Sequence, residues 1–180
     1  QDPVNHGRLL AGSNAVTARA MMAYRSGDGG GSWASSAVSL PATPPNDVTS
    51  DPSMVFDRSG VAYYAYLGLA NSSQFQSQLL MARSGDGGAT WAAPQIVDSI
   101  ADLPDKPLMT LDQTGGAHAG RIYVAYSTND AALTTQGLAV SWSDNGNAWG
   151  KTVIRPGGEN INAIPVIGPQ ARSTWPWTTT

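Results

Sequence analysis

The chain has 180 residues, of which 41% are hydrophobic and only 13% are charged, and it contains 20 glycines, 12 prolines and no cysteine. A formal net charge of −3 without any basic cluster argues against a nucleic-acid partner, and the missing cysteines exclude a disulfide framework and a thiolate zinc site. No apolar run approaches the roughly 18 residues that a membrane-spanning helix needs. Frequent glycine and proline between short apolar runs favour an all-β fold.

Short apolar runs separated by turn residues predict β-strands along most of the chain. In the first third we expect strands at residues 8–12, 18–25 and 33–40, followed by a proline-rich break at residues 41–46. The middle third predicts strands at residues 53–57, 61–67, 78–83 and 91–97. The last third repeats that order at residues 108–112, 121–127, 136–143 and 149–155, and a further apolar run at residues 163–168 predicts one more strand.

One eight-residue stretch occurs twice almost unchanged. It reads Ser-Gly-Asp-Gly-Gly-Gly-Ser-Trp at residues 26–33 and Ser-Gly-Asp-Gly-Gly-Ala-Thr-Trp at residues 84–91. A third copy at residues 142–149 keeps the Asp, the second Gly and the Trp, but has Trp142 in the place of the first Ser. The aspartates Asp28, Asp86 and Asp144 follow one another at intervals of 58 residues. A fixed period of this length indicates a repeat architecture.

The composition of the stretch favours a tight hairpin over a metal or phosphate site. Glycine supplies a positive φ without steric cost, and an Asp carboxylate accepts hydrogen bonds from the N–H groups of its own turn. One carboxylate is too few for a calcium site, which takes about six to eight oxygen ligands, and no Lys follows the glycines as in a phosphate-binding loop. We therefore expect no metal and no cofactor. A structural role is predicted for Ser26, Asp28, Gly30, Trp33, Ser84, Asp86, Gly88, Trp91, Asp144, Gly146 and Trp149.

The pattern Ser-x-Asp-x-Gly-x-Ser/Thr-Trp resembles the Asp box of the BNR repeats in sialidases (neuraminidases). The segments between the boxes resemble the same family, with residues 51–57 leading to residues 61–66 and residues 105–112 leading to residues 121–126. The resemblance to secreted bacterial sialidase-like proteins covers about residues 5–170. It implies an all-β fold, a β-propeller of four-stranded antiparallel blades that is six-bladed when complete, with about three blades present here.

The resemblance divides residues 1–170 into parts of a propeller whose blade strands are named A to D in chain order. Blade 1 has strands B to D at about residues 5–40, blade 2 covers residues 51–97, blade 3 covers residues 105–155, and residues 163–168 supply strand A of a fourth blade. Three blades do not readily close a ring. Two interpretations stay open: the chain is part of a longer one, or two copies associate into a six-bladed ring with two-fold symmetry. The tail at residues 171–180 has no assigned role.

The loops of a propeller blade alternate between two faces, which decides where a site can lie. The boxes join strands C and D, so they share one face, the box face, with the A–B turns. The D–A and B–C loops form the opposite face, the mouth face, where the resemblance places the active site. Asp51 and Asp105 are the catalytic candidates because they precede strand A at equivalent positions, and the alternative is that each caps the turn that enters the strand. Lys106, Asn129 and Asp130 are the ligand-binding candidates.

The residues that sialidases use for catalysis are incomplete in this sequence. The family uses three arginines to hold the substrate carboxylate, an Asp as acid/base and a Tyr nucleophile that a Glu activates. Here the only glutamate is Glu159, and no arginine triad can be assigned. Arg25, Arg83 and Arg121 are expected at the box face, away from the mouth.

Two functions follow from the resemblance. The first is an exported, secreted or periplasmic exo-glycosidase that acts on sialylated or related glycans, or a part of such an enzyme. The alternative is a non-catalytic propeller that binds glycans or protein partners through its mouth face and assembles as a homodimer. The arginine clamp discriminates between them, and it is absent from these residues. In both cases we expect a glycan or small carbohydrate as partner, with no nucleic acid and no membrane span.

Overall fold

A computed structural model describes residues 1–15, 20–41, 46–70, 77–99, 103–129, 136–155 and 162–168. All regular structure in these residues is β-strand, which confirms the predicted all-β class. The described part of the chain contains no helix that is long and apolar enough to cross a membrane.

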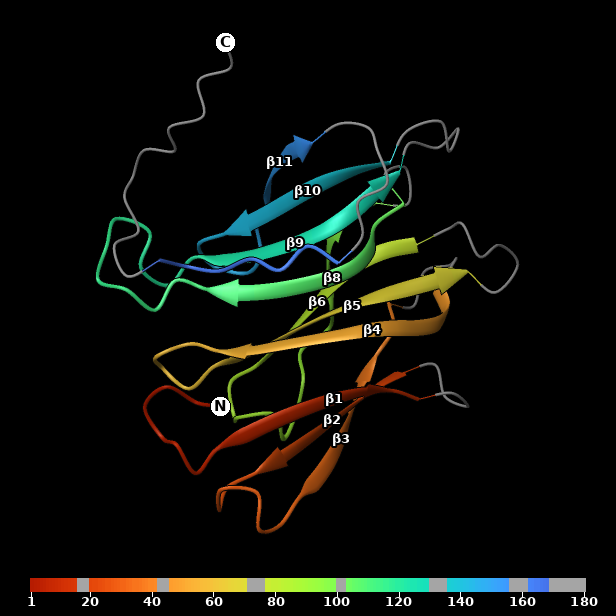
Figure 1. Cartoon of the computed structure of the whole chain (residues 1–180). Helices are drawn as coiled ribbons and strands as arrows, with labels where there is room; N and C mark the ends of the chain where they lie inside the picture. Colours follow the sequence, from red (N-terminus) through yellow and green to blue (C-terminus); the bar gives the residue numbers. More distant parts are fainter. Residues whose placement is uncertain are drawn as a thin grey trace.

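The described strands form three antiparallel sheets that follow one another in chain order. The first sheet contains β1 (Leu9–Asn14), β2 (Ala20–Ser26) and β3 (Ala34–Ser39). The second sheet contains β4 (Asn46–Phe56), β5 (Ala62–Ala70), β6 (Ser77–Ser84) and β7 (Gln95–Asp98). The third sheet contains β8 (Asp105–Leu111), β9 (Ile122–Asn129), β10 (Gln136–Ser143) and β11 (Gly150–Arg155). Figure 1 shows the sheets stacked from the first at the bottom to the third at the top.

The observed strands agree best with the predicted ones at β3, β6, β10 and β11, whose ends differ by at most one residue. β10 spans the predicted residues, whereas β4 begins at Asn46 and not at residue 53. β7 begins at Gln95 and not at residue 91, because Pro94 has no N–H to donate to the ladder. Residues 162–168 alternate between exposed and half-buried as a strand does, but they pair with no strand in the described part of the chain.

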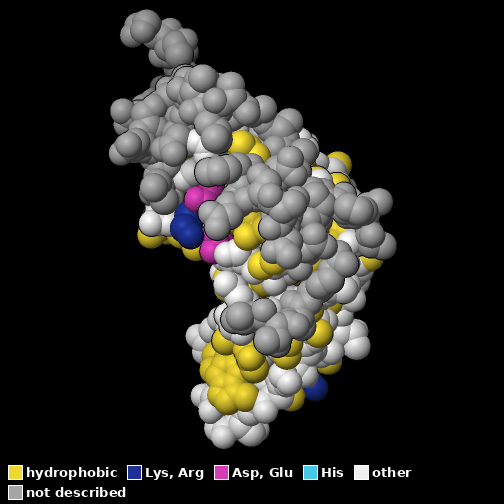
Figure 2. All heavy atoms as spheres, turned by 90° about the vertical axis from the view of Figure 1, so that its right-hand side faces the viewer, with side chains coloured by type: hydrophobic (Ala, Val, Ile, Leu, Met, Phe, Trp, Pro, Cys, Tyr) yellow, Lys and Arg dark blue, Asp and Glu magenta, His cyan; other side chains and the backbone are white. Residues whose placement is uncertain are grey.

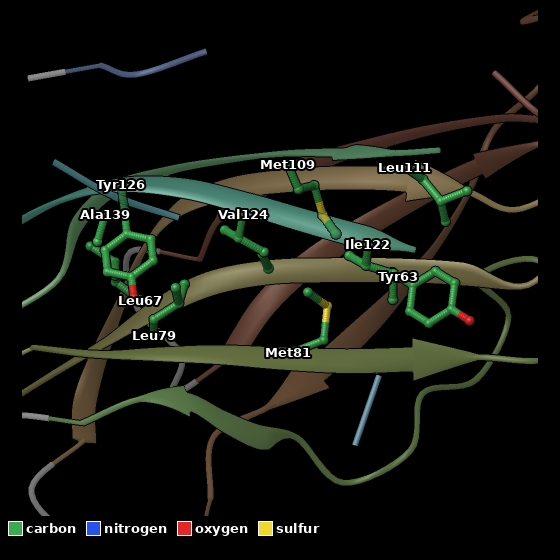
Figure 3. Packing of buried hydrophobic residues seen from close by; sticks show 11 residues of the cluster. Tyr63, Leu67, Leu79, Met81, Met109, Leu111, Ile122, Val124, Tyr126 and Ala139 are labelled. Atoms are coloured by element: carbon green, nitrogen blue, oxygen red, sulfur yellow. The ribbon is translucent and has the colours of Figure 1, made fainter. Parts of the chain in front are cut away.

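The core lies in two layers, one on each face of the second sheet. β5 contributes to both layers, since Tyr63, Ala65 and Leu67 face the third sheet while Tyr64 and Tyr66 face the first. This explains the continuous apolar run of β5, because a strand that is covered on both faces has no solvent-facing positions. Figure 3 shows the layer toward the third sheet, which is formed by Tyr63, Ala65, Leu67, Leu79, Met81, Met109, Leu111, Ile122, Val124, Tyr126 and Ala139.

The first two box turns are closed by a carboxylate that only accepts hydrogen bonds. Asp86 accepts from the hydroxyl and the N–H of Thr90 at 2.6 and 2.9 Å, from the hydroxyl of Ser84 at 2.7 Å and from the N–H of Ala89 at 3.0 Å. The hydrogen bonds from Thr90 and Ser84 hold the pKa of Asp86 well below its ordinary value. Gly88 returns its N–H to Ser84 at 2.7 Å from a backbone with φ of 91°, a conformation that glycine adopts without steric cost.

Asp28 closes the first box turn in the same way. It accepts from the hydroxyl of Ser32 at 2.6 Å, from the N–H of Ser32 at 2.9 Å and from the hydroxyl of Ser26 at 2.7 Å. These bonds also hold the pKa of Asp28 well below its ordinary value, with the Ser32 hydroxyl as the largest contribution. The two near-identical stretches therefore form near-identical hairpins.

The third box turn is built differently from the predicted alignment. Asn145, and not Asp144, accepts the turn N–H groups of Asn147 at 2.8 Å and Ala148 at 3.1 Å, and Ser143 accepts from the N–H of Gly146 at 2.9 Å. Ser143 and Asn145 thus occupy the places of Ser84 and Asp86, in a turn that is one residue shorter. The regular spacing of Asp144 from the other two aspartates is therefore coincidental.

Asp144 forms an ion pair with Arg121 at the start of β9. The guanidinium donates to both carboxylate oxygens, at 2.6 and 2.9 Å, and it lies 4.6 Å from the ring centre of Trp142. This contact lowers the pKa of Asp144, mainly through the hydrogen bonds from Arg121. Because Arg121 follows the turn after β8, the pair joins a box turn to that turn and places both on the box face.

Candidate functional site

β4 and β8, the first strands of the second and third sheets, have the same backbone distortion, and we call them the inner strands. Asp51 in β4 has φ of 55° and Lys106 in β8 has φ of 53°, and each directly precedes a proline. The pairing register shifts at both places, between residues 50 and 53 of β4 and between residues 105 and 108 of β8. Left-handed backbone is uncommon for residues other than glycine and is concentrated at functional sites.

The two distorted positions bring a carboxylate and an ammonium group together. The Nζ atom of Lys106 lies 3.4 Å from Oδ2 of Asp51, and Ser50 donates its hydroxyl to Oδ1 of Asp51 at 2.7 Å. The Lys106 side chain is 46% exposed and that of Asp51 is 20% exposed. An ion pair this accessible contributes at most about 1 kcal/mol to stability. A ligand can therefore replace the contact between the two side chains at little cost in free energy of folding.

Asp105 is not the counterpart of Asp51, which differs from the sequence prediction. The shared positive φ and the following proline make Lys106 the counterpart, while Asp105 is the half-buried first residue of β8. The N–H of Met109 in β8 donates to the hydroxyl of Ser53 in β4 at 2.9 Å, so the two inner strands lie against each other. Asp51, Asp105 and Lys106 therefore share one edge of the molecule.

This edge belongs to the mouth face. β4 and β8 run from this side toward the box face, where Arg121, which follows the turn after β8, contacts the box residue Asp144. Figure 2 views the molecule from the side at which β4 and β8 begin. At its left-hand edge, where the outline is hollowed, a basic side chain lies between acidic ones.

The other predicted ligand-binding residues do not join this group through any described contact. Asn129 is the last residue of β9 and pairs with Gln136 of β10, at the end of the third sheet that belongs to the mouth face. Asp130 lies outside the described residues.

The arginine side chains with described contacts lie at the box face, as predicted for Arg121. Arg8 donates to Asp2 at 2.8 Å and to the carbonyl of Gly60 at 3.3 Å, and Arg58 donates to the carbonyl of Gln113. None of these three arginines reaches the mouth face. Among the described residues, no group of three or more His, Cys, Asp and Glu side chains could hold a metal ion.

A buried polar cluster between the second and third sheets was missed by the sequence interpretation. Tyr126 donates its hydroxyl to Asp98 at 2.6 Å, its oxygen lies 2.8 Å from that of Ser141, and Lys151 lies 3.2 Å from the Asp98 carboxylate. Asp98 is only 7% exposed and Tyr126 is fully buried. Tyr66 makes the corresponding bond one sheet earlier, to the carbonyl of Ser39 at the end of β3, at 2.7 Å. The cluster is thus a repeated link between neighbouring sheets and not an open site.

Comparisons with known proteins agree with the fold. The chain matches the Hadza microbial sialidase Hz136 with a TM-score of 0.63 and 16% identity, over 85% of this chain and 36% of that one. It matches an α-L-arabinanase of Penicillium chrysogenum, solved with arabinobiose, with a TM-score of 0.58 and 15% identity, over 84% of this chain and 48% of that one. It also matches a leech intramolecular trans-sialidase in a complex with 2,7-anhydro-Neu5Ac that was prepared by soaking with 3′-sialyllactose, with a TM-score of 0.57 and 12% identity, over 87% of this chain and 42% of that one.

These likenesses confirm the fold, in which the three sheets form part of a β-propeller. The chain spans less than half of each of these three proteins. No family model matches the sequence, and a search of curated proteins finds no match either.

Proposed function

We propose that the mouth face of this chain binds a glycan, and that Asp51, Asp105 and Lys106 contact the sugar. The observation that carries the proposal is the Asp51–Lys106 pair at two matching distortions of the inner strands. The sialidases and the arabinanase among the structural neighbours make a carbohydrate the first ligand to test.

The chemistry of the pair suits sugar hydroxyls. Each hydroxyl donates one hydrogen bond and accepts others, so neighbouring hydroxyls need an acceptor and a donor side by side. An ionised Asp only accepts and a Lys ammonium only donates, and hydrogen bonds to charged groups are stronger than neutral ones. A loosely paired Asp51 and Lys106 supply both partners at the half-exposed edge of the inner strands.

The binding test uses Lys106→Gln with Arg58→Gln as its matched control. Each variant removes one positive charge, the first from the mouth face and the second from the exposed box face. We expect Lys106→Gln to weaken binding of 3′-sialyllactose or arabinobiose by at least about 10-fold in calorimetric titration, the loss of one charged hydrogen bond. Arg58→Gln should leave the affinity unchanged. Equal affinities of both variants and the wild-type protein would exclude Lys106 from the site.

The second candidate is hydrolysis by a glycosidase of exo type, in which Asp51 or Asp105 transfers the proton. The half-buried Asp105 at the mouth face favours it, because a general acid or base must lie within reach of the glycosidic oxygen. Release of a fluorophore from a sialoside or an arabinofuranoside by the wild-type chain, and its loss in Asp105→Asn, would establish catalysis. Binding without release would leave the protein a glycan-binding propeller. A glycan ligand also fits export of the protein to the cell exterior or periplasm, which belongs to the same proposal.

A further inference from the structure

Among the described strands, the first sheet has no counterpart of β4 and β8. β1 pairs only with β2, whereas the corresponding strands β5 and β9 also pair with β4 and β8. One repeated backbone bond fixes the correspondence. The backbone N–H groups of three aspartates, Asp2, Asp57 and Asp112, each donate to the carbonyl of the residue immediately before the next strand, at 3.0, 2.9 and 2.8 Å. The acceptors are Arg8, Val61 and Arg121, so Leu9 corresponds to Ala62 and Ile122.

In the described part of the chain, the edge of β1 that faces away from β2 is unpaired. Ala11 is exposed, while its counterparts Tyr64 and Val124 are buried because the preceding sheet covers the face to which they point. The box end of the edge is nevertheless already shaped as in the other sheets. Asp2 accepts the N–H groups of Val4 and Asn5 at 2.9 and 3.1 Å, just as Asp57 accepts those of its own turn. The unpaired edge of β1, which we call the slot, is therefore bounded at its box end by the turn that begins at Asp2, and its backbone groups are available for pairing along β1.

Residues 162–168 have the features of the missing kind of strand. Asn162 has φ of 62°, close to the values of Asp51 in β4 and Lys106 in β8. Beyond it the chain alternates in exposure, with Ile164 at 72% and Val166 at 82%. Figure 1 places this segment, in blue, at the end of the array occupied by the third sheet, and β1, in red, at the other end.

We propose that residues 162–166 of a second copy of this chain pair with the open edge of β1. The segment and the slot lie at opposite ends of one chain, so two copies related by a two-fold axis fill both slots at once. Each copy then contributes three sheets to a ring of six blades. The proposal is independent of what the mouth face binds.

The register of this pairing follows from the two complete sheets. Met54 pairs with Tyr64 in the second sheet and Met109 with Val124 in the third. Counting from the distorted residues, Pro165 is the counterpart of both methionines and Ala11 that of their partners. Pro165 therefore lies opposite Ala11, and Val166 lies opposite Leu10.

The proline in this segment fits the proposed register. The N–H of Met109, the counterpart of Pro165, donates sideways to Ser53 and not to β9. A proline at this position therefore costs no hydrogen bond in the ladder with β1. The same geometry makes positions 165 and 11 a non-hydrogen-bonded pair, which is the closer of the two antiparallel pair types.

A disulfide between these positions tests the proposal, because the chain has no cysteine of its own. Ala11→Cys combined with Pro165→Cys should form, on oxidation, a covalent species of twice the 18.7 kDa chain mass. The wild-type protein should be a dimer by native mass spectrometry. Ala11→Cys combined with Ser59→Cys, a position in the exposed turn after β4, should give no such species.

A second pair of variants covers the case in which the cysteines disturb folding. Ile164→Asp should convert the dimer to a monomer with unchanged circular dichroism, whereas Ile96→Asp, at a residue of β7 that is also exposed, should leave it dimeric. A monomeric wild-type chain would overturn the proposal. So would a dimer that Ile164→Asp leaves intact and that shows no cross-link between positions 11 and 165, or a cross-link formed within one chain.

Discussion

Asp86 stabilises its hairpin only as a carboxylate, because all four of its hydrogen-bond partners donate to it. The same holds for Asp28 in the first box turn. Their pKa values lie well below the ordinary 3.8, owing first to the hydroxyls of Thr90 and Ser32. In the third turn the uncharged side chain of Asn145 accepts the hydrogen bonds of the turn N–H groups. The three turns thus differ in their response to acid.

The acid response of Asp86 can be measured directly. Its folded pKa is lower than its unfolded value of 3.8, so the unfolded chain binds more protons as the pH falls below that value. The stabilisation by Asp86 is therefore complete above about pH 4 and is lost as the pH falls toward the folded pKa. Urea unfolding between pH 5 and about pH 2 should show a smaller loss of stability for Asp86→Asn than for the wild-type protein. Equal losses would show that the Asp86 carboxylate does not stabilise the fold.

At the scale of residues, the sequence predicts the structure of individual turns well, but it predicts poorly which residues correspond between repeats. The hairpins at residues 26–33 and 84–91 follow from Gly, Asp and Trp within a few positions of one another. The third turn was misaligned because Asp144 kept the spacing of 58 residues while the turn lost one residue. The sequence matches Asp51 to Asp105 because both are expected just before strand A at equivalent positions. The prolines at 52 and 107 were the signal that would have matched it to Lys106.

At the scale of elements, buried tyrosines connect each sheet to the preceding one through hydrogen bonds. Tyr64, Tyr66 and Tyr126 each cross from one sheet to the preceding one, where they donate to Met22, Ser39 and Asp98. Burial raises the pKa of Tyr64 and Tyr66, so both stay protonated and able to donate. A buried hydroxyl requires such a partner. These links fix how one sheet sits on the next.

The link at Tyr126 should be stronger than the link at Tyr66, because its acceptor is a carboxylate. We expect Tyr126→Phe to lower the free energy of unfolding by about 2 kcal/mol and Tyr66→Phe by about 1 kcal/mol. Urea denaturation followed by tryptophan fluorescence measures both. A larger loss for Tyr66→Phe would show that the charge on Asp98 adds nothing to the link.

Strand positions were predictable where the sequence pattern is set by burial alone. β5 and β6 of the second sheet are covered on both faces and read as apolar runs. The distortions at Asp51 and Lys106 leave no such pattern, because they change the path of the backbone and not its apolar content. The link between Asp98 and Tyr126 joins residues 28 positions apart, and its Lys151 partner lies 53 positions from Asp98. Spacings of this kind have no local signature.

For the whole molecule, the stacking of three sheets is what creates a mouth face. Two inner strands lie against each other through Ser53 and Met109, and this contact sets Asp51 beside Lys106 although they are 55 residues apart. Neither residue would form a site on an isolated sheet. The all-β fold could be predicted from the repeat, whereas the Asp51–Lys106 pair depends on packing between repeats.

A titration of the isotopically labelled chain with 3′-sialyllactose, and separately with arabinobiose, followed by amide nuclear magnetic resonance, tests the glycan site most directly. We expect shifts that saturate and that concentrate at Asp51, Asp105 and Lys106, with the box residues Asp28 and Asp86 unaffected. Shifts confined to the box face, or the absence of any shift at millimolar concentrations of both sugars, would contradict a glycan site at the mouth face.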